Sequence, residues 1–247
     1  MYRETAAPPA LRPYVECLWT RDPAGAPAAE HRVLPDGCID LIFAFAGDGA
    51  LADAYAVGTM TRAIMVGPHD GAAMLGVRFH PGGASALLGC EASPLTDLRV
   101  PLRDAAPSLP PDVEARLHAA GEAARAVELC RALEGILPAA RAVDPLVAAA
   151  CARVRGAEGR LRVERLGDAL GVTRQHLARA FARHVGVSPK TFARVARLQA
   201  LVRRARSESD PRWSVLAAEM GFADQAHLCG EFRELVGVSP ARFAASG

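Results

Sequence analysis

GVTRQHLARAFARHVGVSPKTF occupies residues 171–192, and GFADQAHLCGEFRELVGVSPARF at residues 221–243 repeats its pattern. When residues 176–193 are shifted by 51 positions, ten of the eighteen are identical. Internal repetition at a fixed spacing predicts that one structural unit is built twice. The C-terminal part of the chain is therefore expected to contain two copies of the same small helical unit.

Within each copy, a glycine separates two predicted helices. The first helix ends at Gly171 in one copy and at Gly221 in the other, and glycine is the residue that most easily adopts the left-handed C-cap conformation. The second helix follows Thr173 or Asp224, which stand at matching positions and are good N-cap residues. The expected first helices cover Val163–Leu170 and Ser214–Met220.

The second helix of each copy has an apolar side and a polar side. Its apolar residues recur at i, i+4 and i+8, as Leu177, Phe181 and Val185 and again as Leu228, Phe232 and Val236. The other side of the first copy carries Arg174, Gln175, Arg179 and Arg183. This arrangement predicts a helix-turn-helix, whose second helix fits a DNA major groove. A helical bundle with a solvated basic face is the alternative, but a bundle requires neither the paired glycine turns nor the matched caps.

Both copies close with Gly-Val-Ser-Pro, in which serine can cap the next helix and proline can begin it. After the first copy that helix is expected to run from about Pro189 to Arg206, which is on the order of 25 Å at the usual helical rise. A rod of this length could place the two second helices in successive major grooves, roughly 34 Å apart. A DNase footprint much shorter than two half-sites would contradict this geometry.

The charge of the chain is distributed unevenly. Residues 1–140 contain 11 Arg and 17 acidic residues, whereas residues 141–247 contain 18 Arg and Lys and 10 acidic residues. A basic half attached to an acidic half suggests a polyanionic partner for the basic half. The hydrophobic content of 51% and charged content of 23% are those of a globular protein and argue against disorder.

Targeting and cysteine patterns indicate a cytoplasmic protein. No apolar stretch is long enough for a transmembrane helix, so no membrane partner is expected. The N-terminus lacks the pattern of a secretory signal. The six cysteines contain no CxxC pair, which favours reduced structural thiols over disulfides or a zinc site.

The fold class expected for the whole chain is α+β. The N-terminal part, residues 1–138, is expected to be a β-sandwich or barrel-like domain with a few helices at its end. Residues 144–247 are expected to form an all-α domain with two helix-turn-helix units joined by a long helix, and Pro138–Asp144 is the expected hinge. The strands are predicted at Cys38–Phe45, Tyr55–Val57, Ile64–Val66 and Met74–Phe79, and the helices at Val113–Ala120 and Glu122–Leu137. Turns are expected at Gly47-Asp48-Gly49, Gly67-Pro68 and Asp70-Gly71.

The two repeated stretches resemble the AraC/XylS family of transcription regulators over about Asp144–Phe243. The second copy is similar to the signature region of that family, with its Gly-Phe opening, Phe232-Arg233 and the Gly-x-Ser-Pro close. PDGCIDLIF at residues 35–43 and GVRFHPGG at residues 76–83 resemble β-rich sensor domains that precede such units. The resemblance implies a sequence-specific DNA-binding regulator with double-stranded DNA and RNA polymerase as partners.

The family's DNA contacts can be carried over to matching positions. Base-edge contacts are implied for Gln175, Ala178 and Arg179 in the first copy and for Gln225, Ala226 and His227 in the second. Phosphate contacts, which position the protein without specifying sequence, are expected from Arg174, Arg183, Arg197 and Arg233. The same surface includes Thr173, Asp224, His176 and His227, and each histidine either contacts DNA or packs beneath the turn.

One position departs from the family. Gly230 stands where a long polar or basic side chain is common. Glycine inside a helix costs about 1 kcal/mol relative to alanine, and its position lacks a base-reading side chain. The second copy is therefore expected to discriminate less sharply than the first.

The resemblance implies that the N-terminal part binds a small effector, pairs two subunits into a homodimer, or does both. Its apolar strands either line a pocket or fill a sandwich core, and core is the better expectation for any single residue. No metal or cofactor is expected, since His31, His69 and His80 lack the close spacing of metal ligands.

An enzyme is the alternative from another class, in the form of an alkyl-transfer repair protein with an appended DNA-binding unit. Cys38 is its candidate nucleophile, because it follows a turn and could be exposed. A reactive thiol needs a lowered pKa, whereas the neighbouring Asp36 and Asp40 would raise it. No nucleophile–base pair or phosphate-binding glycine loop supports catalysis, so the chain is not expected to be an enzyme.

Overall fold

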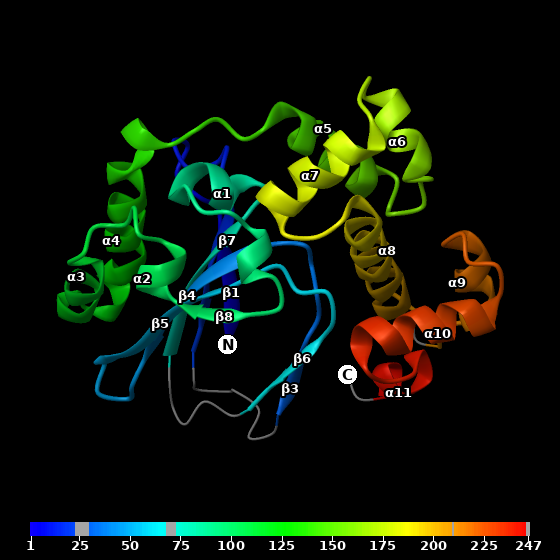
Figure 1. The fold of residues 1–247 in the computed structure, drawn as a ribbon. Coiled ribbons are helices and arrows are strands. Elements are labelled where there is room, and N and C mark those ends of the chain that lie inside the picture. Colours follow the sequence, from blue (N-terminus) through cyan, green and yellow to red (C-terminus); the bar gives the residue numbers. More distant parts are fainter. Residues whose placement is uncertain (23–29, 68–72, 209, 246–247) are drawn as a thin grey trace.

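The computed structural model describes residues 1–22, 30–67, 73–208 and 210–245 (Figure 1). Its N-terminal part is built on a six-stranded antiparallel sheet in the order β1-β2-β7-β4-β5-β8. These strands are β1 (Tyr2–Thr5), β2 (Val15–Arg21), β4 (Ile39–Phe45), β5 (Leu51–Val57), β7 (Ala73–Phe79) and β8 (Arg99–Pro101). Alternation of buried side chains along β4 shows that the sheet is covered most completely on one face.

Helices cover that face of the sheet and complete its core (Figure 1). The helices are α1 (Gly83–Leu88), α2 (Leu102–Ala105), α3 (Val113–Ala119) and α4 (Glu122–Gly135), with single 3-10 turns at Ser93–Leu95 and Leu137–Ala139. Leu41, Phe43 and Val77 point from the sheet into this core and are fully buried. Leu117 and Leu129 meet them from α3 and α4, which explains why this part of the chain carries helical apolar periodicity.

A two-stranded ribbon lies opposite the other face. It pairs β3 (His31–Val33) with β6 (Ile64–Val66) in antiparallel register. A cavity of about 510 Å³ separates the ribbon from the sheet, with residues of both contributing to its wall. The N-terminal part is thus an open sandwich whose smaller layer leaves a cavity.

The C-terminal part is helical throughout its described elements. It consists of α5 (Pro145–Gly156), α6 (Glu164–Ala169), α7 (Arg174–Val185), α8 (Pro189–Arg206), α9 (Trp213–Glu219), α10 (Gln225–Val236) and α11 (Pro240–Ala245). It has two separate apolar cores, one around Phe181 and one around Phe232. Helix α8 runs between them and contributes to both (Figure 1). Within the described residues, no helix is long and apolar enough to cross a bilayer.

Most elements agree with the sequence predictions. The α+β class is confirmed, as are the four predicted strands, although β5 begins four residues earlier than expected. The strands β1, β2, β3 and β8 were not predicted; β1 is exposed along its whole length and so lacks the alternation that marks a strand. Of the expected turns, Asp70-Gly71 and Pro68 lie outside the described residues.

Candidate nucleic-acid interface

The first helix-turn-helix unit consists of α6 and α7. Gly171 follows α6 with a φ of 69°, the left-handed conformation that glycine adopts without strain. The Thr173 hydroxyl then accepts a hydrogen bond of 3.2 Å from the backbone N–H of His176, as an N-cap of α7. Phe181, at the centre of the apolar stripe, packs edge-on against Phe192 of α8 with 5.8 Å between ring centroids.

The second unit, α9 and α10, repeats this construction. Gly221 has a φ of 73°, and a carboxylate oxygen of Asp224 accepts a 2.8 Å hydrogen bond from the N–H of His227. Phe232 packs edge-on against Phe243 at 5.5 Å, as Phe181 does against Phe192. The glycine turns, caps and apolar stripes predicted from the repeat are therefore confirmed.

The outer faces of α7 and α10 are exposed at all six positions predicted to contact base edges. On α7 the exposed residues are Arg174, Gln175, His176, Ala178 and Arg179, and on α10 they are Gln225, Ala226, His227 and Gly230. Arg233 is also exposed, whereas Cys229 is half-buried against the core of the second unit. Two helices thus each present a polar face while burying the opposite stripe.

Two of the predicted phosphate contacts are engaged within the protein. The Arg197 side chain is 16% exposed, binds the Glu231 carboxylate at 2.7 Å and lies over the ring of Phe222. This ion pair between α8 and α10 holds the second unit against the long helix. Arg197 would have to break its contact with Glu231 to reach a phosphate. Arg183 is more accessible but lies 3.5 Å from Glu91 of the N-terminal part.

The two histidines have different surroundings. His227 packs edge-on against Phe222 at 5.4 Å, and its Nδ1 accepts a 3.3 Å hydrogen bond from the N–H of Ala223. His176 is exposed at the start of α7. His227 thus makes the packing contact while it stays exposed, so both roles remain open for it.

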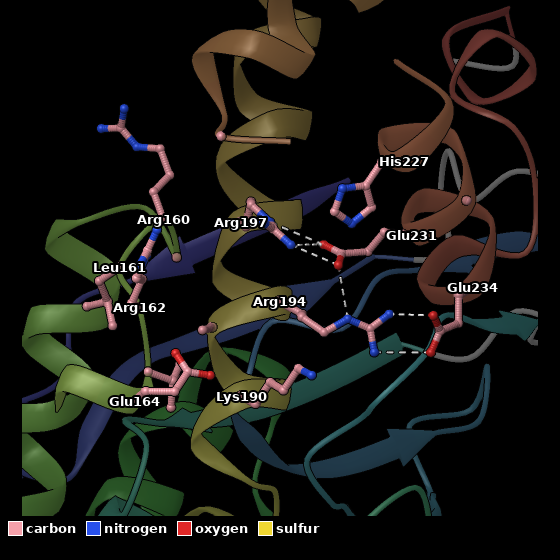
Figure 2. Close-up of a pocket in the computed structure, with 15 residues that line it drawn as sticks. Arg160, Leu161, Arg162, Glu164, Lys190, Arg194, Arg197, His227, Glu231 and Glu234 are labelled. Carbon is pink, nitrogen blue, oxygen red and sulfur yellow. Dashed lines mark hydrogen bonds and ion pairs between the residues drawn. The ribbon is translucent and has the colours of Figure 1, made fainter. Parts of the chain in front are cut away.

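A groove of about 780 Å³ runs along α8 between the two units (Figure 2). Arg160 and Arg162, in the loop before α6, lie on one side, and α10 with His227 and Gly230 lies on the other. Lys190 lies at the end of the groove where α8 begins. These three cations were not among the predicted contacts, although the basic run from Arg160 to Arg165 is a signal that sequence reasoning could have used.

The C-terminal end of α7 is bound to the N-terminal part of the chain. The last carbonyls of a helix have no partner within the helix, and here they are satisfied from outside. The Thr59 hydroxyl donates to the Val185 carbonyl at 2.6 Å, and the Thr96 hydroxyl donates to the Gly186 carbonyl at 2.7 Å. Thr59 is 1% exposed, so this contact is shielded from water.

Helices α8 and α10 are also bound by segments of the N-terminal part. The N–H of Ala63 donates to the Leu235 carbonyl at the end of α10, at 2.6 Å. The side-chain amide of Gln199 on α8 donates to the Pro35 carbonyl at 2.6 Å. Residues 59–63 therefore contact the ends of α7 and α10, and residues 34–38 contact the helix that joins the two units.

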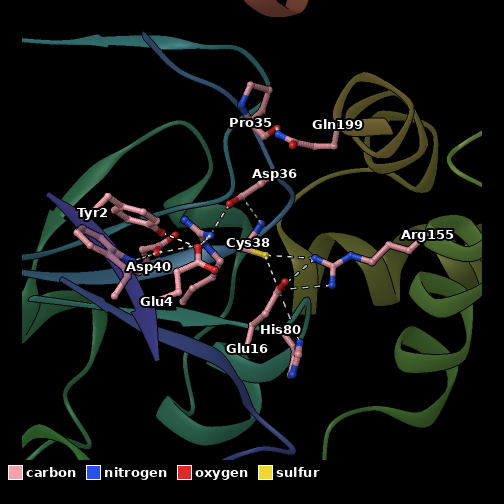
Figure 3. A network of polar contacts seen from close by, with 12 residues as sticks. Tyr2, Glu4, Glu16, Pro35, Asp36, Cys38, Asp40, His80, Arg155 and Gln199 are labelled. Atoms are coloured by element: carbon pink, nitrogen blue, oxygen red, sulfur yellow. Dashed lines mark hydrogen bonds and ion pairs between the residues drawn. The ribbon is translucent and has the colours of Figure 1, made fainter. Parts of the chain in front are cut away.

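Cys38 lies at this junction and is buried, so it lacks the exposure that a nucleophilic role would need (Figure 3). Its thiol lies 3.4 Å from Glu16 and 3.3 Å from the Arg155 guanidinium of α5. Burial, together with the charges of Asp36 and Glu16, raises the pKa of this thiol well above its usual value. These surroundings are those of a structural thiol and disfavour the alkyl-transfer alternative.

Comparison with known proteins agrees with this architecture. Residues 166–246 match the model of a helix-turn-helix domain, and residues 3–101 match a domain of unknown function, DUF6597. An uncharacterized HTH-type transcriptional regulator from Haemophilus influenzae is 29% identical over 84 residues, which are 34% of this chain. The matched region spans only 28% of the length of that relative.

Solved structures of ToxT from Vibrio cholerae are similar in arrangement at low sequence identity. One, bound to (E)-4-(8-methylnaphthalen-1-yl)but-3-enoic acid, is 10% identical with a TM-score of 0.48 and covers 99% of this chain and 98% of its own. Another, bound to an unsaturated fatty acid, is 13% identical with a TM-score of 0.45 and covers 87% and 89%.

The match over residues 166–246 includes both recognition helices, α7 and α10, with their caps and glycine turns. The paired units, the long helix between them and the matched domain agree with the signature residues of the repeat. Residues 166–246 thus form a helix-turn-helix domain of the type found in AraC-type transcription regulators.

Proposed function

We propose that this protein is a sequence-specific DNA-binding transcription regulator that contacts two successive major-groove segments. The observation that carries the proposal is the pair of capped recognition helices whose polar faces are exposed while their apolar stripes are buried. In α7, Gln175, Ala178 and Arg179 contact base edges. In α10, Gln225 and Ala226 do so, and His227 supports the turn.

Phosphate contacts come from cations around these faces. Arg174 and Arg233 are exposed beside the recognition positions, and Arg160, Arg162 and Lys190 line the groove between the units. Arg183 takes the same role when its contact with Glu91 opens. The proposal includes a cytoplasmic location and no catalytic activity; pairing of two copies and contact with RNA polymerase stay predictions.

We expect DNA affinity to depend strongly on salt. Each neutralised phosphate adds about −0.9 to the slope of log K against log salt concentration, so four or five contacts give a slope of about −4. The measurement is fluorescence anisotropy on a duplex selected from random sequences, with a DNase footprint of the same site. Two protected segments roughly one helical turn apart are expected. A salt-independent affinity, or protection of a single half-site, would contradict the proposal.

We further propose that the N-terminal part, about residues 1–138, controls residues 144–247 through an effector bound in the cavity between the sheet and the ribbon. Two short segments, residues 59–64 and 96–98, both line the cavity and contact the recognition helices. Met60 and Ile64 line the cavity, while Thr59 and Ala63 beside them bind the ends of α7 and α10. Asp97 and Leu98 line it next to Thr96.

Removing the two threonine hydroxyls is expected to loosen the first unit from the N-terminal part. In the double variant Thr59→Val, Thr96→Val, two carbonyls at the end of α7 lose their donors, at a cost of about 1–3 kcal/mol each. Hydrogen–deuterium exchange is expected to become faster in residues 92–98 and 183–187 and to stay unchanged in α9.

The matched control is Thr61→Val. The Thr61 hydroxyl donates its hydrogen bond to Asp97 within the N-terminal part rather than to a carbonyl of a recognition helix. Unchanged exchange at residues 183–187 in the double variant, or an equal acceleration there in the control, would show that these hydroxyls do not hold α7.

A further inference from the structure

The cavity between the sheet and the ribbon has a wall suited to an apolar molecule with aromatic groups. Its polar surface is much smaller than its apolar surface, as in typical small-molecule sites. Three aromatic side chains contribute to it, Tyr2, Trp19 and Tyr55, together with aliphatic and methionine side chains from both layers: Ile42, Val57, Met60, Ile64, Met65 and Met74. Aromatic faces of this kind also attract cations.

Acidic groups outnumber basic ones at one end of the cavity. Figure 3 shows Glu4, Asp36 and Asp40 gathered there. The Arg78 guanidinium lies 3.2 Å from Asp36, 3.5 Å from Asp40 and 3.3 Å from Glu4. Three carboxylates thus share one guanidinium, and two of them, Asp36 and Asp40, line the cavity. Asp40 is the more buried, with 14% of its side chain exposed, and accepts a 2.7 Å hydrogen bond from the Trp19 indole.

Asp97 and two further arginines, Arg21 and Arg99, line the rest of the cavity, so the acidic excess belongs to this end. Arg99 is paired with Asp53 and lies over the Tyr55 ring at 3.7 Å, so its charge is already compensated. This contact also shows that an aromatic face of the cavity accepts a cation. Arg21 lies beside the His31 ring, at 3.2 Å, on the ribbon side.

We propose that this cavity binds an apolar molecule carrying a positively charged nitrogen or comparable cationic centre, whose charge is neutralised by Asp36 and Asp40. The inference rests on the proposed effector control and specifies the chemical class of the effector. An anion would face two partly buried carboxylates, and the guanidinium nearest to it is already shared by three. Burial of a cation is favourable only where carboxylates are present to pair with it.

The position of Asp36 connects the ligand to the DNA-binding part. Asp36 belongs to the segment Leu34–Cys38, and its carboxylate also accepts a 2.9 Å hydrogen bond from the N–H of Cys38. Leu34 packs against the core of the second unit. Gly37, with a φ of 81°, lies so close to Phe192 that a β-carbon there would stand 2.6 Å from the ring. A charge that engages Asp36 therefore acts on a segment in contact with both units.

Two ions of opposite charge and nearly equal shape test the proposal. Tetraphenylphosphonium is expected to bind the full-length protein, as measured by calorimetry, at least tenfold more tightly than tetraphenylborate. Asp40→Asn and Asp36→Asn keep the oxygen acceptors for Trp19 and Cys38 but remove one negative charge each. Either variant is expected to weaken binding of the phosphonium about tenfold and to leave or strengthen binding of the borate.

Glu4→Gln is the matched control, because Glu4 contacts Arg78 but does not line the cavity. A smaller loss of phosphonium affinity is expected in this variant. Equal or tighter binding of the borate, binding of neither ion, or wild-type phosphonium binding by the Asp36 and Asp40 variants overturns the proposal. DNA affinity of the same preparations is measured separately, so loss of the ligand class is distinguished from loss of the regulator function.

A pH series gives an independent readout. Burial, with the nearby Asp36 and Glu16, raises the pKa of Asp40 to about 7, although Arg78 and the Trp19 hydrogen bond oppose this. The other charged groups at this end are Glu4 on β1 and Arg78 on β7. Because the carboxylate form binds a cation, phosphonium affinity is expected to rise up to about tenfold from pH 6 to pH 8. A flat profile in the wild-type protein, or a rise of the same size in Asp40→Asn, contradicts the role of Asp40.

Discussion

Replacing Arg179 by alanine is expected to lower the affinity for the selected DNA site by about 1–3 kcal/mol, which is roughly 5- to 150-fold. Arg179 is exposed on the outer face of α7, one turn beyond Gln175. A guanidinium at this position can bond to both O6 and N7 of a guanine, and alanine cannot replace either bond. The loss should therefore be accompanied by relaxed preference at one base pair. Affinity for unrelated duplexes should change less.

Gly230→Ala is the matched control, since Gly230 of α10 occupies the position that corresponds to Arg179 in the repeat. A β-carbon there would meet nothing within 4 Å, so the substitution removes no contact. It should stabilise α10 by up to about 1 kcal/mol through helix propensity while leaving sequence preference unchanged. Anisotropy titrations on the selected site and on single-base variants measure both effects. A full-strength footprint from Arg179→Ala would remove Arg179 from the base-reading set.

Phe181→Ala is expected to destabilise the first unit by about 3–5 kcal/mol, because it removes a large aromatic side chain and the surrounding core relaxes only partly into the space. Phe181 is fully buried and contacts Phe192 of α8. The consequence for function is local: the outer face of α7 loses the support that orients it, and the corresponding half of the footprint should disappear. Urea unfolding and footprinting measure the two results.

Phe232→Ala tests the same idea in the second copy. Phe232 is 2% exposed and packs against both Trp213 and Phe243. The Phe232→Ala substitution should remove the other half of the footprint, while residues 174–185 keep slow amide exchange. Since the two cores are separate clusters, loss of both half-sites from either single variant would mean that the units do not fold independently.

The candidate DNA interface was largely predictable, and the reason lies in the range of the interactions that form it. Thr173 and Asp224 bond to N–H groups three residues away, and Gly171 and Gly221 adopt their positive φ within a single turn. The role of Arg197 was less predictable, because its partner Glu231 is 34 residues away in the sequence. The periodicity of α8 places Arg197 on a polar side whether it binds a phosphate or a carboxylate.

The N-terminal part was predicted less completely. The strands with alternating burial, such as β4, were recognised, whereas β1 gains its place only by pairing with β2. A pocket and a filled core predict the same apolar residues, so sequence alone left the two open. The structure shows both: one face of the sheet packs against helices, and the other borders the cavity.

By itself, the sequence determined that two capped helix-turn-helix units follow one another around a long helix, because each signal acts within a few residues. Only the tertiary structure decided where those units are held. Thr59 and Val185 are separated by 126 residues along the chain, and Asp36 and Asp40 meet Arg78 across two strands. Local periodicity carries no information about partners so distant, and these contacts exist only once the sheet, the ribbon and the helices have packed together.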